Sequence, residues 1–204
     1  VNPTDIIHID DSRVFASTNG GILTLNSKYR VLGKLGFNEN LKPLDFKSIY
    51  KDDKEFLWLG ENEPYGGLQI FDLELGNVQR ISHLDFITKI TKIVRFQNRA
   101  FAIGFDSYSC GLLEFSIEDD LVYYQDYYKN FPIPLSEIFD IDINLDSDGS
   151  DPSIILSTDR GLITSSLNQE SIHLSSSWEI LYSESPVYQF CQNYFITDSS
   201  IYFD

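Results

Sequence analysis

The chain has 204 residues, of which 31 are acidic and 15 are basic, so its formal net charge at pH 7 is −16. Phosphate binding needs a basic stripe that this sequence does not contain, so we expect no nucleic-acid partner. Apolar residues make up 42% of the chain, enough for a sizeable core. They never form the long apolar run of a membrane-spanning helix, so we expect no membrane span in this chain.

A short glycine-led segment recurs along the chain. Each copy follows an apolar run and a polar turn, and the four glycines are spaced by 46, 44 and 50 residues. A fifth copy starts 39 residues later, at Ser200. A period of about 45 residues is typical of repeat architectures, in which each unit buries a face against the next. We therefore expect one domain over 1–204, with repeats at approximately 5–35, 46–83, 90–127, 138–183 and 187–204.

Each repeat divides into four strand-like runs. They are rich in Ile, Val, Leu, Phe and Tyr, and turn residues separate them. Sustained helical spacing is missing, and the best helix candidate, 85–92, is short and β-branched. The first repeat predicts strands at 5–10, 14–18, 21–25 and 29–35. Later strands are expected at 46–51, 56–61, 67–71, 77–83, 90–96, 100–105, 111–115, 121–127, 138–143, 154–158, 161–165, 178–183, 187–191, 194–197 and 200–203.

Strands in groups of four with this period predict an all-β chain, a β-propeller of four-stranded antiparallel blades. Second and third strands are almost continuously apolar, as in sheets buried on both faces. The leading glycine is explained by a left-handed or closely approached turn. The chain should form about five blades, the last incomplete. Three strands in the fifth repeat predict either a longer propeller that continues past Asp204 or an open ring, and we favour the first.

The second repeat carries a family resemblance. Its segments 56–62 and 66–72 resemble the two-component regulator propeller repeat, and 16–23 and 156–162 are further copies. Segment 131–136 is similar to the Gly-Leu-Pro-Ser step of that family. The resemblance implies a propeller that binds a ligand or partner outside the cytoplasm, in the periplasm or at the cell surface. Such repeats occur in sensor regions of hybrid histidine kinases and in surface-associated proteins.

Loops between second and third strands are the candidate contact surface, because loops on a rigid scaffold tend to carry function. The longest are 61–66 and 105–111. The expected partner is a protein or a carbohydrate. The candidate contact residues are Glu61, Asn62, Tyr65, Asp106, Tyr108, Asp159 and Arg160.

One loop has the side chains of a calcium site. Asn144, Asp146 and Asp148 place oxygen donors at alternate positions before a glycine, as hard cations require. However, Pro152 and Ile155 stand where such loops carry further carboxylates. A long polar hairpin tip is the other interpretation, and we favour it because it also explains the 50-residue spacing. We therefore expect no cofactor, with calcium as the alternative.

Catalytic patterns are missing from the sequence. His8, His83 and His173 are isolated in separate repeats, and the nucleophile-elbow pattern does not occur. Cys110 and Cys191 are expected to be free thiols. The aromatic run 121–128 is expected to pack at a blade edge, although exposed rings there would be contact anchors.

A non-enzymatic binding module for sensing or surface assembly is the leading hypothesis. One alternative is a hydrolase or lyase of carbohydrates or lactones, using calcium or central carboxylates such as Asp45, Asp140 and Asp142. Another is an intracellular scaffold of the WD40 class. The absence of Gly-His and Trp-Asp signatures counts against that scaffold.

Overall fold

The computed structural model describes residues 2–64, 66–145, 151–168, 172–191, 194–198 and 200–203, without the side chains of 191, 202 and 203. These residues form five antiparallel sheets, of which four have four strands and one has three. Strand order within each sheet follows the chain. The predicted all-β fold of four-stranded blades is therefore confirmed.

The five sheets are called blades 1 to 5. Blade 1 contains β1 (Pro3–His8), β2 (Arg13–Thr18), β3 (Gly21–Asn26) and β4 (Val31–Leu35), and blade 2 contains β5 (Phe46–Lys51), β6 (Phe56–Glu61), β7 (Leu68–Asp72) and β8 (Val78–Arg80). Blade 3 contains β9 (Lys89–Phe96), β10 (Arg99–Phe105), β11 (Cys110–Glu118) and β12 (Leu121–Tyr128). Blade 4 contains β13 (Ile138–Asn144), β14 (Ser153–Thr158), β15 (Gly161–Ser166) and β16 (Glu179–Tyr182), and blade 5 contains β17 (Val187–Cys191), β18 (Tyr194–Thr197) and β19 (Ile201–Phe203).

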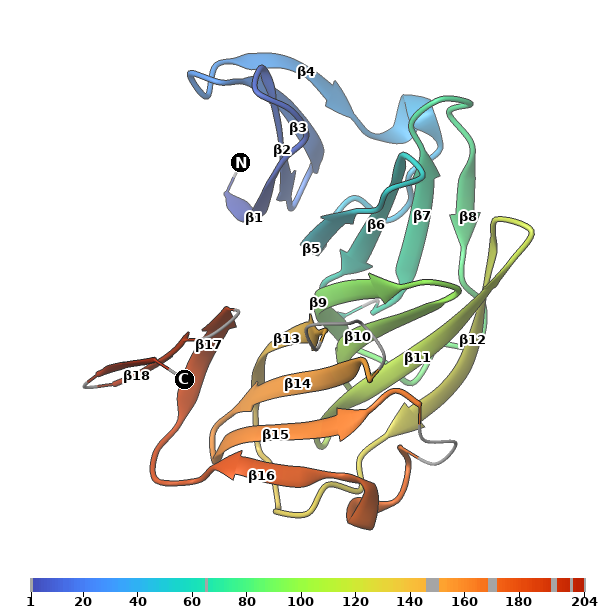
Figure 1. The fold of residues 1–204 in the computed structure, drawn as a ribbon. Helices are drawn as coiled ribbons and strands as arrows, with labels where there is room; N and C mark the ends of the chain where they lie inside the picture. Colours follow the sequence, from blue (N-terminus) through green and yellow to red (C-terminus); the bar gives the residue numbers. More distant parts are fainter. Residues whose placement is uncertain are drawn as a thin grey trace.

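The blades are arranged radially (Figure 1). First strands face the centre, fourth strands lie at the periphery, and blades 1 and 5 lie at the two ends of an open arc. Helical structure is limited to two 3₁₀ turns, η1 (Phe37–Glu39) and η2 (Ser175–Ser177), in the part of the chain described. Segment 85–92, the best helix candidate, is a turn followed by β9. Among the described residues, no helix combines the length and apolar character needed to cross a membrane.

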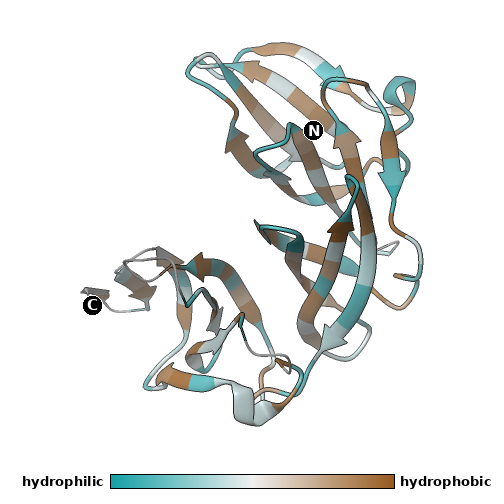
Figure 2. Cartoon of the chain, turned by 45° about the vertical axis from the view of Figure 1, so that its right-hand side comes forward, coloured by the Kyte–Doolittle hydropathy of each residue, from teal (hydrophilic) through white to brown (hydrophobic). Residues whose placement is uncertain are grey.

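Apolar side chains fill the interfaces between neighbouring blades, and the hydropathy colouring shows them along the strands (Figure 2). The second strands are buried along most of their length, as predicted for sheets packed on both faces. Burial of this apolar surface is the main force holding the blades together. Blades 2 and 3 share Trp58, Leu68, Ile70, Ile90, Ala100, Leu113 and Phe115. Blades 3 and 4 share Phe101, Ile103, Leu112, Ile141, Leu156 and Ile163.

Every first strand carries a β-bulge near its beginning, where the register with the second strand shifts by one residue. A bulge bends the strand and increases its twist, so the repeated bulge gives each blade the same local distortion beside the axis. The extra residues are Thr4, Lys47, Thr91, Phe139 and Tyr188.

Third-strand glycines enter their turns as predicted. Gly21 has φ of 111° and Gly161 has φ of 121°, a conformation that other residues rarely adopt. A Cβ on Gly161 would lie 1.9 Å from the carbonyl oxygen of Tyr182. The hydroxyls of Thr18 and Thr158 close these turns by donating to the glycine carbonyl, at 2.6 and 2.9 Å. These glycines therefore have a structural role.

Candidate functional site

The turns between second and third strands meet the linkers that lead into first strands, and together they form one surface, called the loop face. Blade 4 shows the contact clearly: Asp159 accepts hydrogen bonds from the hydroxyl of Ser136, at 2.5 Å, and from the backbone N–H of Glu137, at 3.2 Å. Blade 2 has a matching contact, in which the side-chain amide of Asn62 donates to Asp45 at 3.4 Å. Asp159 and Asn62, two of the predicted contact residues, therefore attach the linkers to the turns.

Glu61 stands where blades 1 and 4 have a turn-closing threonine, at the end of the second strand. Its side chain is fully buried, and its carboxylate accepts from Gln69 Nε2 at 3.0 Å and from Arg80 Nη2 at 3.3 Å. Burial raises the pKa of Glu61, although Arg80 and Gln69 oppose that shift. The structure therefore places this predicted contact residue beneath the surface, with Arg80 above it.

On blade 3, Asp106 organises the turn. It accepts from the backbone N–H groups of Tyr108 and Ser109, both at 2.8 Å, and pairs with Lys129 at 2.9 Å. Burial opposes its ionisation, but Lys129 and the two N–H groups outweigh that effect and lower the pKa of Asp106 to about 2. Tyr108 is 97% exposed. The turn therefore holds a charged pair in place beneath a fully exposed aromatic ring.

Tyr127, near the end of β12, links this turn to the linker before β9. Its ring lies 5.5 Å from that of Phe86, and Lys129 Nζ lies 5.2 Å from its centroid. Its hydroxyl donates to the carbonyl of Gly104 at 3.1 Å, and burial raises its pKa. A Cβ at Gly111 would come within 2.6 Å of the Tyr127 ring, so this third-strand glycine makes room for the ring.

A hollow of about 440 Å³ lies beside this group and is lined by Asp126, Tyr127, Tyr128, Lys129, Asn130 and His173. The rings of Tyr128 and His173 stack with centroids 6.5 Å apart. The Tyr128 hydroxyl donates to Glu114, which pairs with Arg99 at 2.7 Å. Burial, followed by the bond to Glu114, raises the pKa of Tyr128. Its hydroxyl therefore stays protonated and fixed.

These residues form the blade-3 surface, defined as Phe86, Asp106, Tyr108, Tyr127, Lys129 and His173. It offers aromatic rings, an ion pair and an open hollow, a combination suited to recognition. Sequence reasoning identified only Asp106 and Tyr108 as contact residues. The run 121–128 was expected to pack at a blade edge, and Tyr124, Tyr127 and Tyr128 do pack between blades while Leu121 and Tyr123 are exposed.

The turn of blade 4 lies next to this surface. Burial raises the pKa of Cys110, a free and buried thiol at the start of β11, to about 11, and the nearby charge of Asp159 adds to the shift. Arg160 extends into solvent, with its side chain 65% exposed, and lies 3.7 Å from Asp159. The contact candidates of blades 3 and 4 are therefore brought together, whereas Glu61 and Asn62 belong to blade 2.

Central carboxylates come from β13. Asp140 lies 3.9 Å from Lys92, and burial raises its pKa. Asp45 is hydrogen-bonded to Asn62, away from that strand.

The predicted calcium ligands lie at the end of β13 and beyond it. Asn144 ends β13 and lines a hollow of about 360 Å³ with Asp151 and Glu179. Over the described part of the chain, no three His, Cys, Asp or Glu side chains are grouped as metal ligands would be. Tyr65, Asp146 and Asp148 lie outside the described residues.

No protein-family model matches the sequence, and no curated protein matches it either. Solved structures are similar in fold. PorZ of Porphyromonas gingivalis, described as a bacterial surface component of the type-IX secretion system, matches 99% of this chain at 17% identity with a TM-score of 0.68. The extracellular domains of two putative hybrid two-component systems of B. thetaiotaomicron, BT3049 and BT4673, match 98% and 91% of it at 15% and 12% identity, with TM-scores of 0.65 and 0.61.

The chain spans about a quarter of each of these three structures, 26% of PorZ, 26% of the BT3049 domain and 24% of the BT4673 domain. Structural similarity at such low identity supports the arrangement of the blades but not a shared function, so function has to be argued from the residues of this chain. The fold of this chain therefore also occurs in a bacterial surface component and in extracellular domains of putative two-component systems.

Proposed function

We propose that this chain is a non-enzymatic binding module of an extracytoplasmic protein, and that it serves sensing or surface assembly by contacting a ligand or partner protein through the blade-3 surface. The observation that carries the proposal is the arrangement around Tyr108. This ring is fully exposed, yet the turn that bears it is fixed by Asp106 and Lys129. An aromatic side chain presented by a rigid turn loses little entropy on binding.

The surroundings of Tyr108 supply the rest of a recognition surface. Phe86 remains 43% exposed beside Tyr127, and the hollow next to Lys129 and His173 gives a concave neighbour to the exposed rings. Arg160 adds a cation on the adjoining turn. The similarity in fold to a bacterial surface component and to the extracellular domain of a putative hybrid two-component system supports an extracytoplasmic role.

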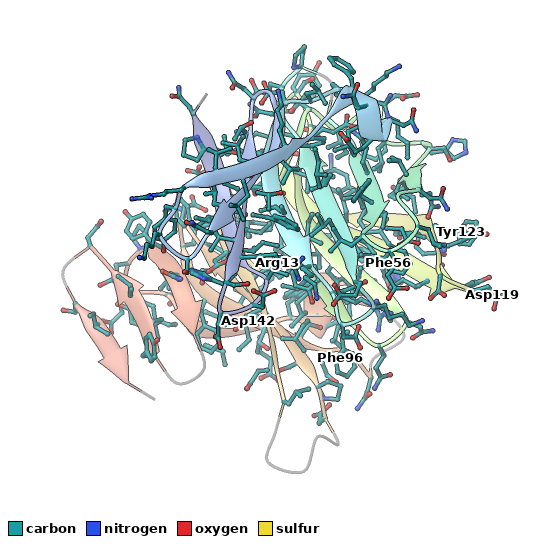
Figure 3. The ribbon with its side chains drawn as sticks, turned by 90° about the horizontal axis from the view of Figure 1, so that it is seen from above. Arg13, Phe56, Phe96, Asp119, Tyr123 and Asp142 are labelled. Atoms are coloured by element: carbon teal, nitrogen blue, oxygen red, sulfur yellow. The ribbon has the colours of Figure 1, made fainter. Side chains whose placement is uncertain are left out.

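The test is a binding screen of the purified chain against immobilised polysaccharides and envelope proteins. Wild type is compared with Tyr108→Ser and Phe86→Ser. Tyr123→Ser is the matched control, because Tyr123 is also exposed but lies on the outer strand β12, pointing away from the body of the molecule (Figure 3). We expect each loop-face variant to weaken binding by about tenfold or more, and the control to leave it unchanged.

Binding that survives both loop-face variants would refute the proposal, as would a loss of binding in the control alone. The same panel separates recognition from catalysis. Release of products from a polysaccharide or lactone, abolished by Asp140→Asn, would instead support the hydrolase alternative at the centre of the blades.

A further inference from the structure

A second hollow lies on the flank of blade 2, away from the blade-3 surface. Its volume is about 570 Å³, and it is formed where the η1 linker meets the outer strands β7 and β8. Two cations and three side-chain amides contribute to its wall. The lining residues are Asn40, Lys42, Gln69, Asn77, Val78 and Arg80.

The floor of this hollow is rigid. Gln69 is 1% exposed, and its Oε1 accepts from the backbone N–H of Lys42 at 3.0 Å. Its Nε2 donates to the carbonyl of Pro43 at 3.2 Å and to Glu61 at 3.0 Å. Because every polar atom of the Gln69 side chain is bonded, the linker is fixed to β7, and Lys42 is held at the rim.

The two cations remain available to a ligand. Arg80 touches the buried carboxylate of Glu61 through one nitrogen, at 3.3 Å, while its side chain is 55% exposed. Lys42 makes no ion pair with any described residue, whereas ten of the fifteen basic side chains have an acidic partner within 4.0 Å. Because Glu61 is the acidic partner of Arg80, Lys42 is the uncompensated positive charge of this hollow, on a chain of net charge −16.

We propose that this hollow binds a small molecule bearing a carboxylate. The planar guanidinium of Arg80 can donate to a carboxylate through the N–H groups that Glu61 does not engage, and the buried Glu61 holds that guanidinium through its terminal Nη2. Lys42 supplies a second positive charge at the rim. Asn40 and Asn77 supply amide groups for the uncharged part of the ligand. This site is separate from the blade-3 surface and from the function proposed there.

The experiment measures succinate binding to the whole chain by saturation-transfer NMR, with the neutral analogue succinamide as the matched probe. Lys42→Gln and Arg80→Gln remove one cation each. Arg80→Lys keeps the charge but removes the planar fork. Lys28→Gln is the control, because Lys28 is an exposed lysine in blade 1 that makes no ion pair with the described residues.

We expect succinate to bind and succinamide not to bind. Lys42→Gln and Arg80→Gln should each weaken succinate binding by about tenfold, Arg80→Lys should weaken it less, and Lys28→Gln should leave it unchanged. Because the Lys42 side chain is exposed, Lys42→Gln should fold normally, so a loss of succinate binding in this variant would reflect the lost charge. Equal binding of the two probes, no binding of succinate, or an equal loss in Lys28→Gln would overturn the proposal. Tyr108→Ser should not affect it, which separates this test from that of the blade-3 surface.

Discussion

Arg95 on β9 donates a 2.5 Å hydrogen bond to Asp52, which follows β5, so that an ion pair joins blades 2 and 3. Asp52 is 3% exposed, and it also accepts from the indole nitrogen of Trp58 at 3.0 Å. Its other oxygen accepts from the backbone N–H of Phe56 at 3.0 Å. One carboxylate therefore closes a turn, orients the largest core side chain and attaches the next blade.

Replacing this carboxylate should destabilise the fold strongly. Asp52→Asn leaves Arg95 largely buried with a weaker partner, and breaking a buried pair costs about 3 kcal/mol. Asp53→Asn is the control, because Asp53 is 86% exposed and lies 3.4 Å from the same arginine. Its expected cost is below about 1 kcal/mol. Urea unfolding of both variants measures the difference, and equal losses would show that the buried pair has no special role.

The geometry of the turn before the third strand of blade 4 predicts that two glycine-to-alanine substitutions differ in their effect on stability. Gly161→Ala introduces a Cβ where φ is 121° and where the carbonyl of Tyr182 lies 1.9 Å away. We expect a loss of at least about 2 kcal/mol in the free energy of unfolding. Gly33→Ala, on β4, has nothing within 4 Å of the new Cβ and should be tolerated. Thermal unfolding of the two variants gives the comparison; a stable Gly161→Ala protein would contradict the turn geometry.

Glu61 predicts a pH dependence. Its folded pKa is raised above the ordinary 4.5 by burial, so the native state binds this proton more tightly than the unfolded chain does. The contribution of Glu61 to stability therefore falls as pH rises from about 4.5 to the raised pKa. Glu61→Gln cannot ionise and should gain stability relative to wild type over that window.

Unfolding curves between pH 4 and pH 8 measure this gain. Glu63→Gln, an exposed neighbour with 62% side-chain exposure, reports the general effect of removing one negative charge. A difference between Glu61→Gln and wild type that stays constant with pH, or that has the opposite sign, would rule out the burial argument.

Two second-strand serines that lie opposite first-strand bulges, Ser17 and Ser157, should differ in their effect on stability. Ser17 Oγ lies 2.9 Å from the hydroxyl of Thr4, the bulged residue of β1. In blade 4 the bulged residue is Phe139, and Ser157 Oγ is buried without a hydrogen-bond partner among the described residues. Ser17→Ala should cost about 1 kcal/mol, whereas Ser157→Ala should be neutral or stabilising. Calorimetry that ranks the two in reverse order would contradict this account.

The blades could be predicted from the sequence because each repeat buries both faces of its sheet. This burial requires apolar runs and a turn glycine, and both recur at a regular spacing along the chain. The sequence was insufficient for the blade-3 surface, because Phe86, Tyr127, Lys129 and His173 come together only through packing between blades. Gln125 illustrates the reason: a bulge there shifts the alternation of β12, so Tyr124 and Tyr127 face blade 2 while Tyr128 faces blade 4. No residue pattern marks that bulge.

The most direct test of recognition at the blade-3 surface is an NMR footprint of a ligand obtained from the binding screen. We expect the amide shifts on binding to concentrate at Phe86, 106–109, 127–130 and His173. Shifts concentrated on the first strands, around Lys92 and Asp140, would contradict this expectation and place the ligand at the centre of the blades.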